Sequence, residues 1–347
     1  MFKAGESVFF FGRKERTYMS KMNESVPKRV DIGGQAVMEG VMMKAPRAIA
    51  VSVRRPDHTI VTKLKPYTPL SEKHKWMGYP FLRGIVNMCT MFTMGMSTLQ
   101  DSTSMLGILD EEPTKFEKWL SEKLGKSVES IVIGIAVILA VALSVGLFFM
   151  LPLGISSLIF GKAASVAGVW KSLTEGLVRL IIFIGYIAFC SSIKDVKRTF
   201  MYHGAEHKTI ACYEAEEELT PENAAKHSRL HPRCGTNYLF LVMAVSILFF
   251  AAIGWNANFL ARLAMRVVFL PVVAGLSYEV LRFAARHDNW LTRIIRAPGM
   301  ALQHLTTKEP TKDMLEVAIT AFNLAMDPNY KVENAAGGGC SVRRMRI

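Results

Sequence analysis

Two short motifs in the second half of the chain carry the residue types best suited to holding a metal ion. In the first, His203 and His207 are one helical turn apart, with Glu206 beside them. On a helix this spacing puts both imidazoles on one face, where they can bind the same ion. In the second, His231 and Cys234 offer a nitrogen and a sulfur across a tight turn. These four side chains predict a site for a divalent cation, and their chemistry favours zinc.

The number of ligands decides what such a site can do. His203, His207 and one further ligand would leave a coordination position open, which is the catalytic zinc arrangement. Adding both His231 and Cys234 would close the shell, and a closed site would be structural. A third interpretation needs no metal, because the same polar residues can cap a membrane helix near lipid phosphates. The motifs alone leave all three interpretations open.

An open coordination position would make Glu206 the residue of greatest chemical interest. The order His-x-x-Glu-His is that of the inverzincin motif, and a metal lowers the pKa of its bound water to about 7. Glu206 could then take the proton as a general base, and Lys208 or Arg233 could meet the developing charge. These roles predict a hydrolase, with peptide, amide and lipid-linked substrates all compatible. Gln35 and Glu39 are candidates for covering the site.

The composition indicates a membrane protein. Half of the 347 residues are hydrophobic, yet the formal net charge is +13. This combination is typical of apolar spans with basic flanks rather than of a soluble core. The basic residues lie beside the apolar stretches, so nucleic acid is not an expected partner. The five cysteines are scattered without a Cys-x-x-Cys pair, which favours a reducing compartment, and the start of the chain has no signal-peptide pattern.

Four stretches have the length and polarity of transmembrane helices. They are residues 130–151, 177–193, 238–255 and 263–283, and Pro152 follows the end of the first. A mainly α-helical membrane protein with about four transmembrane helices is therefore the predicted fold class.

Ionisable residues fall inside the predicted spans, among them Arg179, Arg266 and Glu279. Ionisable groups at membrane depth are costly and often functional. Glu279 is expected either to serve function or to pair with Arg266 or Arg282. A transporter would use such groups, but the chain has no convincing internal repeat.

The distribution of Lys and Arg predicts the orientation. The segment before the first span contains 20 of them, the 194–237 connection contains 7, and the tail from Arg282 contains 10. The connections on the other side contain only Lys162, Lys171 and Arg262. Basic residues accumulate in cytosolic loops. Both termini and the motif-bearing connection are therefore expected in the cytosol.

The remaining segments are arranged around the spans. Strand-like runs at 48–55 and 59–64 predict a cytosolic β-hairpin unit, and Pro298 is expected to break the interfacial stretch after the last span. The predicted divisions are a loose basic N-terminus (1–29), the small β-containing unit (30–80), interfacial or cytosolic helices (81–127), the four-helix core (128–287), further interfacial and cytosolic helices (288–330) and a flexible tail (331–347).

Five blocks occur in a fixed order along the chain. They are GGQAVMEGVMM from Gly33, YHGAEHK from Tyr202, HPRCGT from His231, APG with LQ from Ala297, and LTTKEP from Leu305. Together they resemble the YqhQ-like family of bacterial membrane proteins, a family of unknown function described as predicted metal-dependent enzymes. The resemblance implies a bacterial inner-membrane protein and no particular substrate. By this resemblance, the expected site residues are His203, Glu206, His207, His231 and Cys234.

Two functions from different classes follow from these observations. One is a metal-dependent hydrolase in the membrane, and the other is a scaffold or assembly factor with a structural metal. Ligand count separates them, because an open position beside Glu206 favours the enzyme. Membrane lipids are expected partners, together with an unknown protein or lipid-linked substrate.

Overall fold

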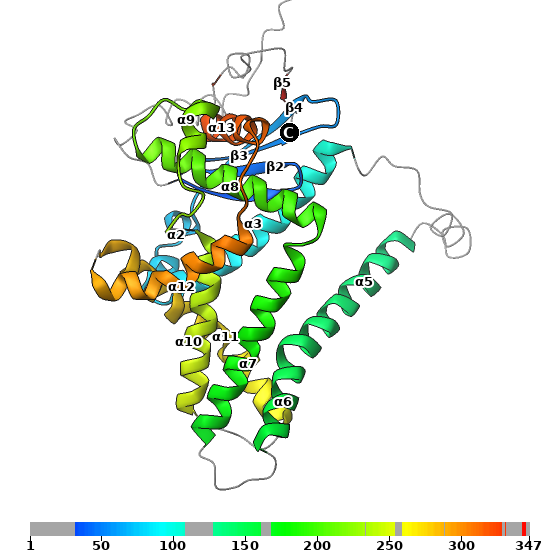
Figure 1. The fold of residues 1–347 in the computed structure, drawn as a ribbon, viewed down its shortest axis with the longest axis vertical. Coiled ribbons are helices and arrows are strands. Elements are labelled where there is room, and N and C mark those ends of the chain that lie inside the picture. Colours follow the sequence, from blue (N-terminus) through cyan, green and yellow to red (C-terminus); the bar gives the residue numbers. More distant parts are fainter. Residues whose placement is uncertain are drawn as a thin grey trace, which may run out of the picture.

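The chain is arranged along one long axis, with a small sheet at one end and long apolar helices at the other (Figure 1). The computed structural model describes residues 32–107, 128–160, 168–232, 234–253, 259–287, 289–327, 330 and 342–344. The N-terminus that was expected to be loose lies outside these ranges, as does most of the predicted flexible tail. Within them most residues are helical, which confirms the predicted fold class.

The sheet contains more strands than the sequence predicted. It runs in chain order through β1 (Gly33–Val37), β2 (Gly40–Lys44), β3 (Ala48–Arg54) and β4 (Ile60–Pro66), all antiparallel, and β5 (Val342–Arg344) adds to β4 in parallel. The predicted hairpin is β3–β4. Its turn is closed by the Thr59 N–H donating to Asp57 Oδ1 at 2.9 Å, while His58 takes a left-handed φ of 63°. The glycine-rich β1 and β2 were missed because glycine disfavours strands, and cross-strand pairing outweighs that preference.

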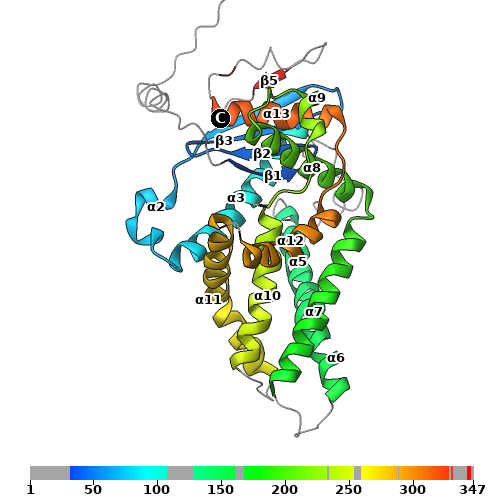
Figure 2. The same cartoon turned by 60° about the vertical axis from the view of Figure 1, so that its left-hand side comes forward.

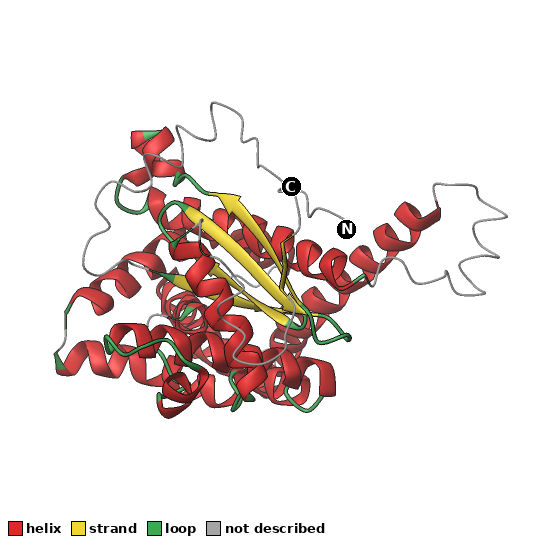
Figure 3. Ribbon diagram, turned by 90° about the horizontal axis from the view of Figure 1, so that it is seen from above, coloured by secondary structure: helices red, strands yellow, loops and turns green. Residues whose placement is uncertain are grey.

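One face of the sheet packs against α8 (Lys194–Glu214) and α13 (Lys312–Met326). Val41 of β2, Tyr202 of α8 and Phe322 of α13 belong to one buried core, and each is at most 2% exposed. Burying such a side chain contributes about 1.5–3 kcal/mol. The helix that carries the two histidines is thus held on the sheet by its apolar face. Seen from above, the strands lie across the helices (Figure 3).

The opposite face of the sheet is covered by α3 (Leu82–Leu106), whose Met105 is fully buried against it. Asp101 of α3 accepts hydrogen bonds from Lys63, at 2.9 Å, and from Lys65 of β4. Burial by itself would raise the pKa of Asp101, but the bonds from the two lysines lower it below its usual value. The sheet is therefore enclosed between helices on both faces.

Within the described residues, four helices are long and apolar enough to cross a membrane, as the sequence predicted. They cover Val137–Phe160, Gly168–Cys190, Gly235–Ile253 and Leu263–Arg286. They belong to α5 (Val128–Val145) continued by η3 (Gly146–Met150) and α6 (Leu151–Phe160), and to α7 (Gly168–Cys190), α10 (Gly235–Ile253) and α11 (Phe259–Arg286). Figure 2 shows that these helices run away from the sheet. At most 28% of each apolar window is buried inside the protein, so most of its side chains are free to face lipid.

The first span does not end before Pro152, contrary to the prediction. Proline has no N–H, so the carbonyl of Phe148, four residues earlier, loses its helical partner. The helix widens into the π turn of η3 just before the proline, and Arg179 Nε of α7 donates to that Phe148 carbonyl at 2.7 Å. The helix continues to Phe160 because a neighbouring helix satisfies the group that proline leaves free.

A buried ion cluster joins α7 to α11 within the spans. Glu175 is 2% exposed, and its Oε1 lies 2.8 Å from Arg179 Nη2 and 2.6 Å from Arg266 Nη2. The expected pairing of Glu279 with Arg266 or Arg282 is not found, since Glu279 pairs with Arg83 of α3. The sequence did not identify Glu175 as a residue of the spans, because the predicted second span begins at residue 177. In the structure α7 already begins at residue 168 and includes Glu175.

The stretch that Pro298 was expected to break is a single helix, α12 (Trp290–Thr306). Its start is closed by reciprocal bonds between Asn289 and Thr292, which form a capping box. A proline removes one backbone hydrogen bond and bends a helix, but it need not end one whose packing continues on both sides. Here α12 packs against α10. The short helices are α2 (Leu70–Lys73), η1 (Lys75–Gly78) and α9 (Pro221–Lys226).

We expect Glu175→Gln to destabilise the protein, because it would leave Arg179 and Arg266 buried without a compensating charge. Removing one partner of a buried ion pair costs ~3–5 kcal/mol. Denaturant unfolding in detergent measures the loss. Glu222→Gln is the matched control, since Glu222 and Lys312 form an ion pair whose side chains are 61% and 70% exposed. The control should lose far less, because water screens an exposed ion pair. Equal stability of the two variants would contradict the role assigned to Glu175.

Candidate metal site

The histidine helix α8 is held in position by contacts at its first turns. Glu39, in the turn between β1 and β2, pairs with Arg198 and accepts from the Tyr202 hydroxyl at 3.3 Å. On another side, a Cβ at Gly204 would lie 2.1 Å from the Lys308 carbonyl oxygen, so the segment after α12 passes directly against α8. Glu39 therefore orients the helix and does not cover the site. Only glycine permits the approach at Gly204.

Both histidines of α8 are oriented by hydrogen bonds to backbone carbonyls. His203 Nδ1 lies 2.8 Å from the Thr306 oxygen, and His207 Nδ1 lies 2.6 Å from the Arg229 oxygen. A carbonyl oxygen only accepts, so each Nδ1 carries a proton, and in the neutral ring Nε2 then keeps its lone pair. Metal-binding histidines are oriented in this way, with the nitrogen that does not bind the ion donating to a carbonyl or carboxylate. Both rings are thus prepared to bind through Nε2.

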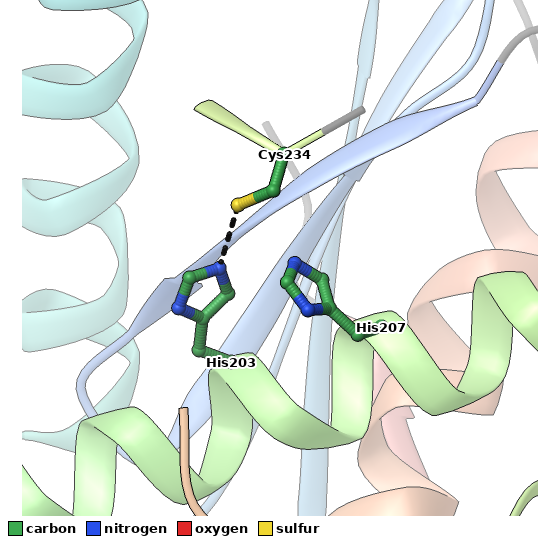
Figure 4. A group of neighbouring side chains, drawn as sticks. All are labelled: His203, His207 and Cys234. Atoms are coloured by element: carbon green, nitrogen blue, oxygen red, sulfur yellow. Dashed lines mark hydrogen bonds between the residues drawn. The ribbon is translucent and has the colours of Figure 1, made fainter. Parts of the chain in front are cut away.

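Cys234 completes a group of three side chains that could hold a metal ion. The ligand atoms of His203, His207 and Cys234 all lie within 4.8 Å of one another, and His203 Nε2 is 3.2 Å from Cys234 Sγ. Ordinary zinc bond lengths and tetrahedral angles put such a nitrogen and sulfur about 3.5 Å apart. Figure 4 shows the two rings, from successive turns of α8, directed at the cysteine.

His207 gives an independent test of whether these residues fit a metal. Its ring is 1% exposed, and its Nε2 has no hydrogen-bond partner within the described part of the chain. A buried polar atom without a partner costs free energy, and native structures seldom contain one without a reason. A cation bound at Nε2 would supply the missing partner. The donor set of two nitrogens and one sulfur also suits a divalent cation of the zinc type.

His231 lies beside this group but outside it. Its ring centroid is 5.7 Å from that of His207, and its Nε2 is directed at Glu214 Oε2, 3.4 Å away. The backbone of His231 is held by the buried Gln303, which accepts from its N–H and donates to its carbonyl, both at 2.8 Å. Of the four predicted ligands, three are therefore brought together, and the fourth faces a carboxylate.

Glu206 is buried against the first strand. A Cβ at Gly34 would lie 2.8 Å from the Glu206 carboxylate, and the Gly34 N–H donates to it. Burial raises the pKa of Glu206 to about 7, while the nearby His203 and the Gly34 N–H act in the opposite direction. Its Oε2 has no partner among the described residues. The carboxylate is close enough to His203 to interact with it and retains one free oxygen.

Other residues considered from the sequence have different positions. Lys208 Nζ donates to two backbone carbonyls at the end of α9 and lies 3.1 Å from Glu309 Oε2, so it is already used. The geometry does not support its predicted role beside the reacting group. Arg233 lies outside the described residues. The side chain of Gln35 lies against Gly95 of α3.

Three residues that orient the site were not singled out from the sequence. Thr306 and Arg229 contribute the carbonyls that accept from the histidines, and Gln303 fixes the loop before α10. Arg229 Nη1 also donates to the Thr307 carbonyl at 2.6 Å, which joins that loop to the end of α12. Two of the three act through backbone atoms, so residue type gave no signal for them. For Gln303 and Thr306 the only signal was their position in two of the blocks that resemble the family, Leu302-Gln303 and the block from Leu305.

A second group of potential ligands contains Cys212, Glu217 and His227. Here His227 Nε2 is 3.2 Å from Glu217 Oε2, and Cys212 Sγ is directed at the Glu218 carbonyl, 3.6 Å away. These donors already have partners, whereas His207 Nε2 has none in the described residues. The first group is therefore the stronger candidate.

Comparison with known proteins agrees with the resemblance read from the sequence. Residues 79–328, which include the whole three-residue group, match the family described as "Protein of unknown function (DUF1385)". The chain is 35% identical over 303 residues to the uncharacterized protein YqhQ of Bacillus subtilis (strain 168), covering 84% of this chain and 91% of that protein. No solved structure matches the chain. These similarities assign no reaction and no metal.

We expect the purified protein to bind about one equivalent of a divalent cation through the three-residue group. His207→Ala should weaken binding by more than the roughly 10–100-fold typical of losing an outer partner, because it removes a ligand. His231→Ala, the matched control, should retain most of the affinity. Metal content and titration measure both variants, with circular dichroism to check folding. Full binding by His207→Ala would remove it from the ligand set, and a comparable loss in His231→Ala would add that residue.

Proposed function

We propose that this protein, which belongs to the DUF1385 family of proteins of unknown function, is a membrane-bound, metal-dependent hydrolase. We assign His203, His207 and Cys234 as the ligands of one zinc ion. The observation that carries the assignment is the pair of Nδ1 hydrogen bonds that turn both Nε2 atoms toward the cysteine. Imidazole and thiolate are both zinc ligands, and three protein ligands are the number found at catalytic zinc sites.

Three protein ligands leave one position of a tetrahedral site free, and this is what favours chemistry over a purely structural role. When bound, zinc would supply Lewis acidity that lowers the pKa of a water and polarises the bond to be cleaved. The free Oε2 of Glu206 is the atom to which we assign acceptance of the proton from the attacking water. Gly34 holds the other side of that carboxylate through its N–H, which restricts its movement.

The position of the site indicates the kind of substrate. Cys234 directly precedes the span Gly235–Ile253, and α8 begins at Lys194, just after the span that ends at Cys190. The three ligands therefore lie within a few residues or turns of a membrane boundary. His203 and Cys234 are partly exposed whereas His207 is buried, so substrate would approach from the side of the first two. A peptide, amide or lipid-linked bond held near the membrane surface fits this location.

A second candidate function rests on His231. Its ring is next to that of His207, and turning away from Glu214 would bring it toward the group as a fourth ligand. A closed shell of four ligands would be structural. The protein would then be a scaffold or assembly factor in which the metal fastens the loop before α10 to α8. The His231→Ala titration described above separates the two functions.

We also propose that the protein lies in a bacterial inner membrane with the sheet and both termini in the cytosol. The basis is the bias of Lys and Arg toward those segments. A reporter fused after Ile347 should then read cytosolic, and one inserted within residues 161–167 should read external. Alkaline phosphatase and fluorescent protein fusions provide complementary readouts. A cytosolic reading at 161–167 would contradict the four-span arrangement.

Glu206→Gln tests the chemistry rather than the coordination. The amide has nearly the same shape but cannot accept a proton, so metal content and membrane insertion should be kept while function falls ~10²–10⁴-fold. Complementation of a deletion strain, paired with metal analysis, measures the two effects together. If Glu206 is a ligand instead, metal is lost along with function. Normal function in a metal-replete Glu206→Gln strain would contradict the hydrolase proposal.

A further inference from the structure

A cavity of about 580 Å³ lies between α11, the first turns of α3 and the α2–η1 segment. Its polar lining includes Arg83, Arg282 and Arg286, together with Asn87 and Tyr278. No ligand of the candidate metal site lines it, so the cavity is a separate feature. Figure 2 shows α2 beside the end of α11 that is nearer the sheet.

The lining of the cavity carries an excess of positive charge. Among the residues that the structure describes, it contains three arginines and no acidic residue. Arg83 is compensated by Glu279, whose Oε1 accepts from Arg83 Nε at 2.7 Å and from the Phe81 N–H at 3.1 Å. Arg282 and Arg286 form no hydrogen bond or ion pair with any residue that the structure describes, and Arg286 interacts with Glu279 only at longer range. Two cations therefore face the same cavity without a bonded counter-charge, and an anionic ligand would supply one.

The surroundings place the cavity at a membrane boundary. The fourth span ends at Arg286, one of the lining residues. Large aromatic side chains are exposed nearby in the chain, with Trp76 53%, Tyr79 61% and Trp290 74% exposed. Tryptophan and tyrosine collect at the headgroup level of a bilayer, where one end of the ring is apolar and the other is hydrated. The cavity is therefore at the depth of lipid headgroups.

We propose that this cavity binds the phosphate of an anionic phospholipid headgroup. Arginine binds phosphate oxygens through charge-assisted, often bidentate hydrogen bonds, and Arg282 and Arg286 supply the donors. Asn87 and Tyr278 offer polar groups to the remainder of the headgroup. The cavity volume lies within the roughly 300–1,000 Å³ of small-molecule sites. Phosphatidylglycerol has a negatively charged phosphate and a small polar headgroup.

Binding at this position would connect the spans to the sheet. The first turns of α3 line the cavity, and its last turns carry Asp101 and Met105, which contact the sheet. A headgroup held between α3 and α11 would stabilise the packing of these two helices. This inference does not depend on the proposed hydrolase or on a bound metal.

The test uses the full chain in nanodiscs of phosphatidylcholine with graded amounts of spin-labelled phosphatidylglycerol. The wild-type protein should retain phosphatidylglycerol in preference to labelled phosphatidylcholine. Arg282→Gln and Arg286→Gln should each weaken that preference about tenfold, since each removes a charge-assisted contact. Arg293→Gln is the matched control, because Arg293 is an exposed arginine of the neighbouring α12 and does not line the cavity. It should change the preference less than about twofold.

Each remaining outcome overturns the proposal. Equal retention of the two lipids would show that the cavity does not recognise the headgroup. An equal loss in Arg293→Gln would show that diffuse surface charge is responsible. Displacement of the lipid by inorganic phosphate at matching concentration would identify a soluble phosphate as the ligand. Arg286 is exposed, so Arg286→Gln is expected to fold and gives a result even where Arg282→Gln does not insert.

Discussion

The hydrogen bonds from the two imidazole Nδ1 atoms to the carbonyls of Thr306 and Arg229 are the interactions on which the candidate site depends. They determine which ring nitrogen carries the proton and where the other one points. Each requires a different segment to lie against α8, namely the end of α12 and the loop before α10. Gln303 holds that loop through both backbone groups of His231. Loss of any one of these segments would release a ring, so the site is a property of the assembled fold.

The sheet determines where α8 lies. The apolar side of the helix, with Tyr202 and Ala205, is buried in the core shared with β2, β3 and α13. Because a helix repeats every 3.6 residues, the polar side chains between these positions point away from that core. Glu206 lies where the two sides meet and is buried against Gly34. The first strands and the last long helix are thus part of the same unit as the histidines, although much of the chain separates them.

A common rule accounts for the membrane region and for the candidate metal site. Buried polar groups need partners, and most of those in this protein have them. Arg179 satisfies the carbonyl that Pro152 leaves free, and Glu175 compensates two arginines at once. Among the described residues, the buried atoms without a partner include His207 Nε2 and Glu206 Oε2, both at the candidate metal site. At His207, a bound cation is the simplest physical account of the nitrogen that the described residues leave without a partner.

The sequence by itself determined the features that depend on neighbouring residues. The i, i+4 spacing of His203 and His207 and the length of the four apolar stretches are local, so both were readable. Pairing between distant segments could not be predicted from the sequence. The partner of Glu279, the position of Glu175 and the direction of His231 depend on which helices are in contact, and no periodicity encodes that. Pro152 and Pro298 were misread for the same reason, since tertiary packing keeps both helices continuous. Only the tertiary structure decided that three ligands meet and the fourth faces Glu214, because ligand count is set by distances in space and not by spacing along the chain.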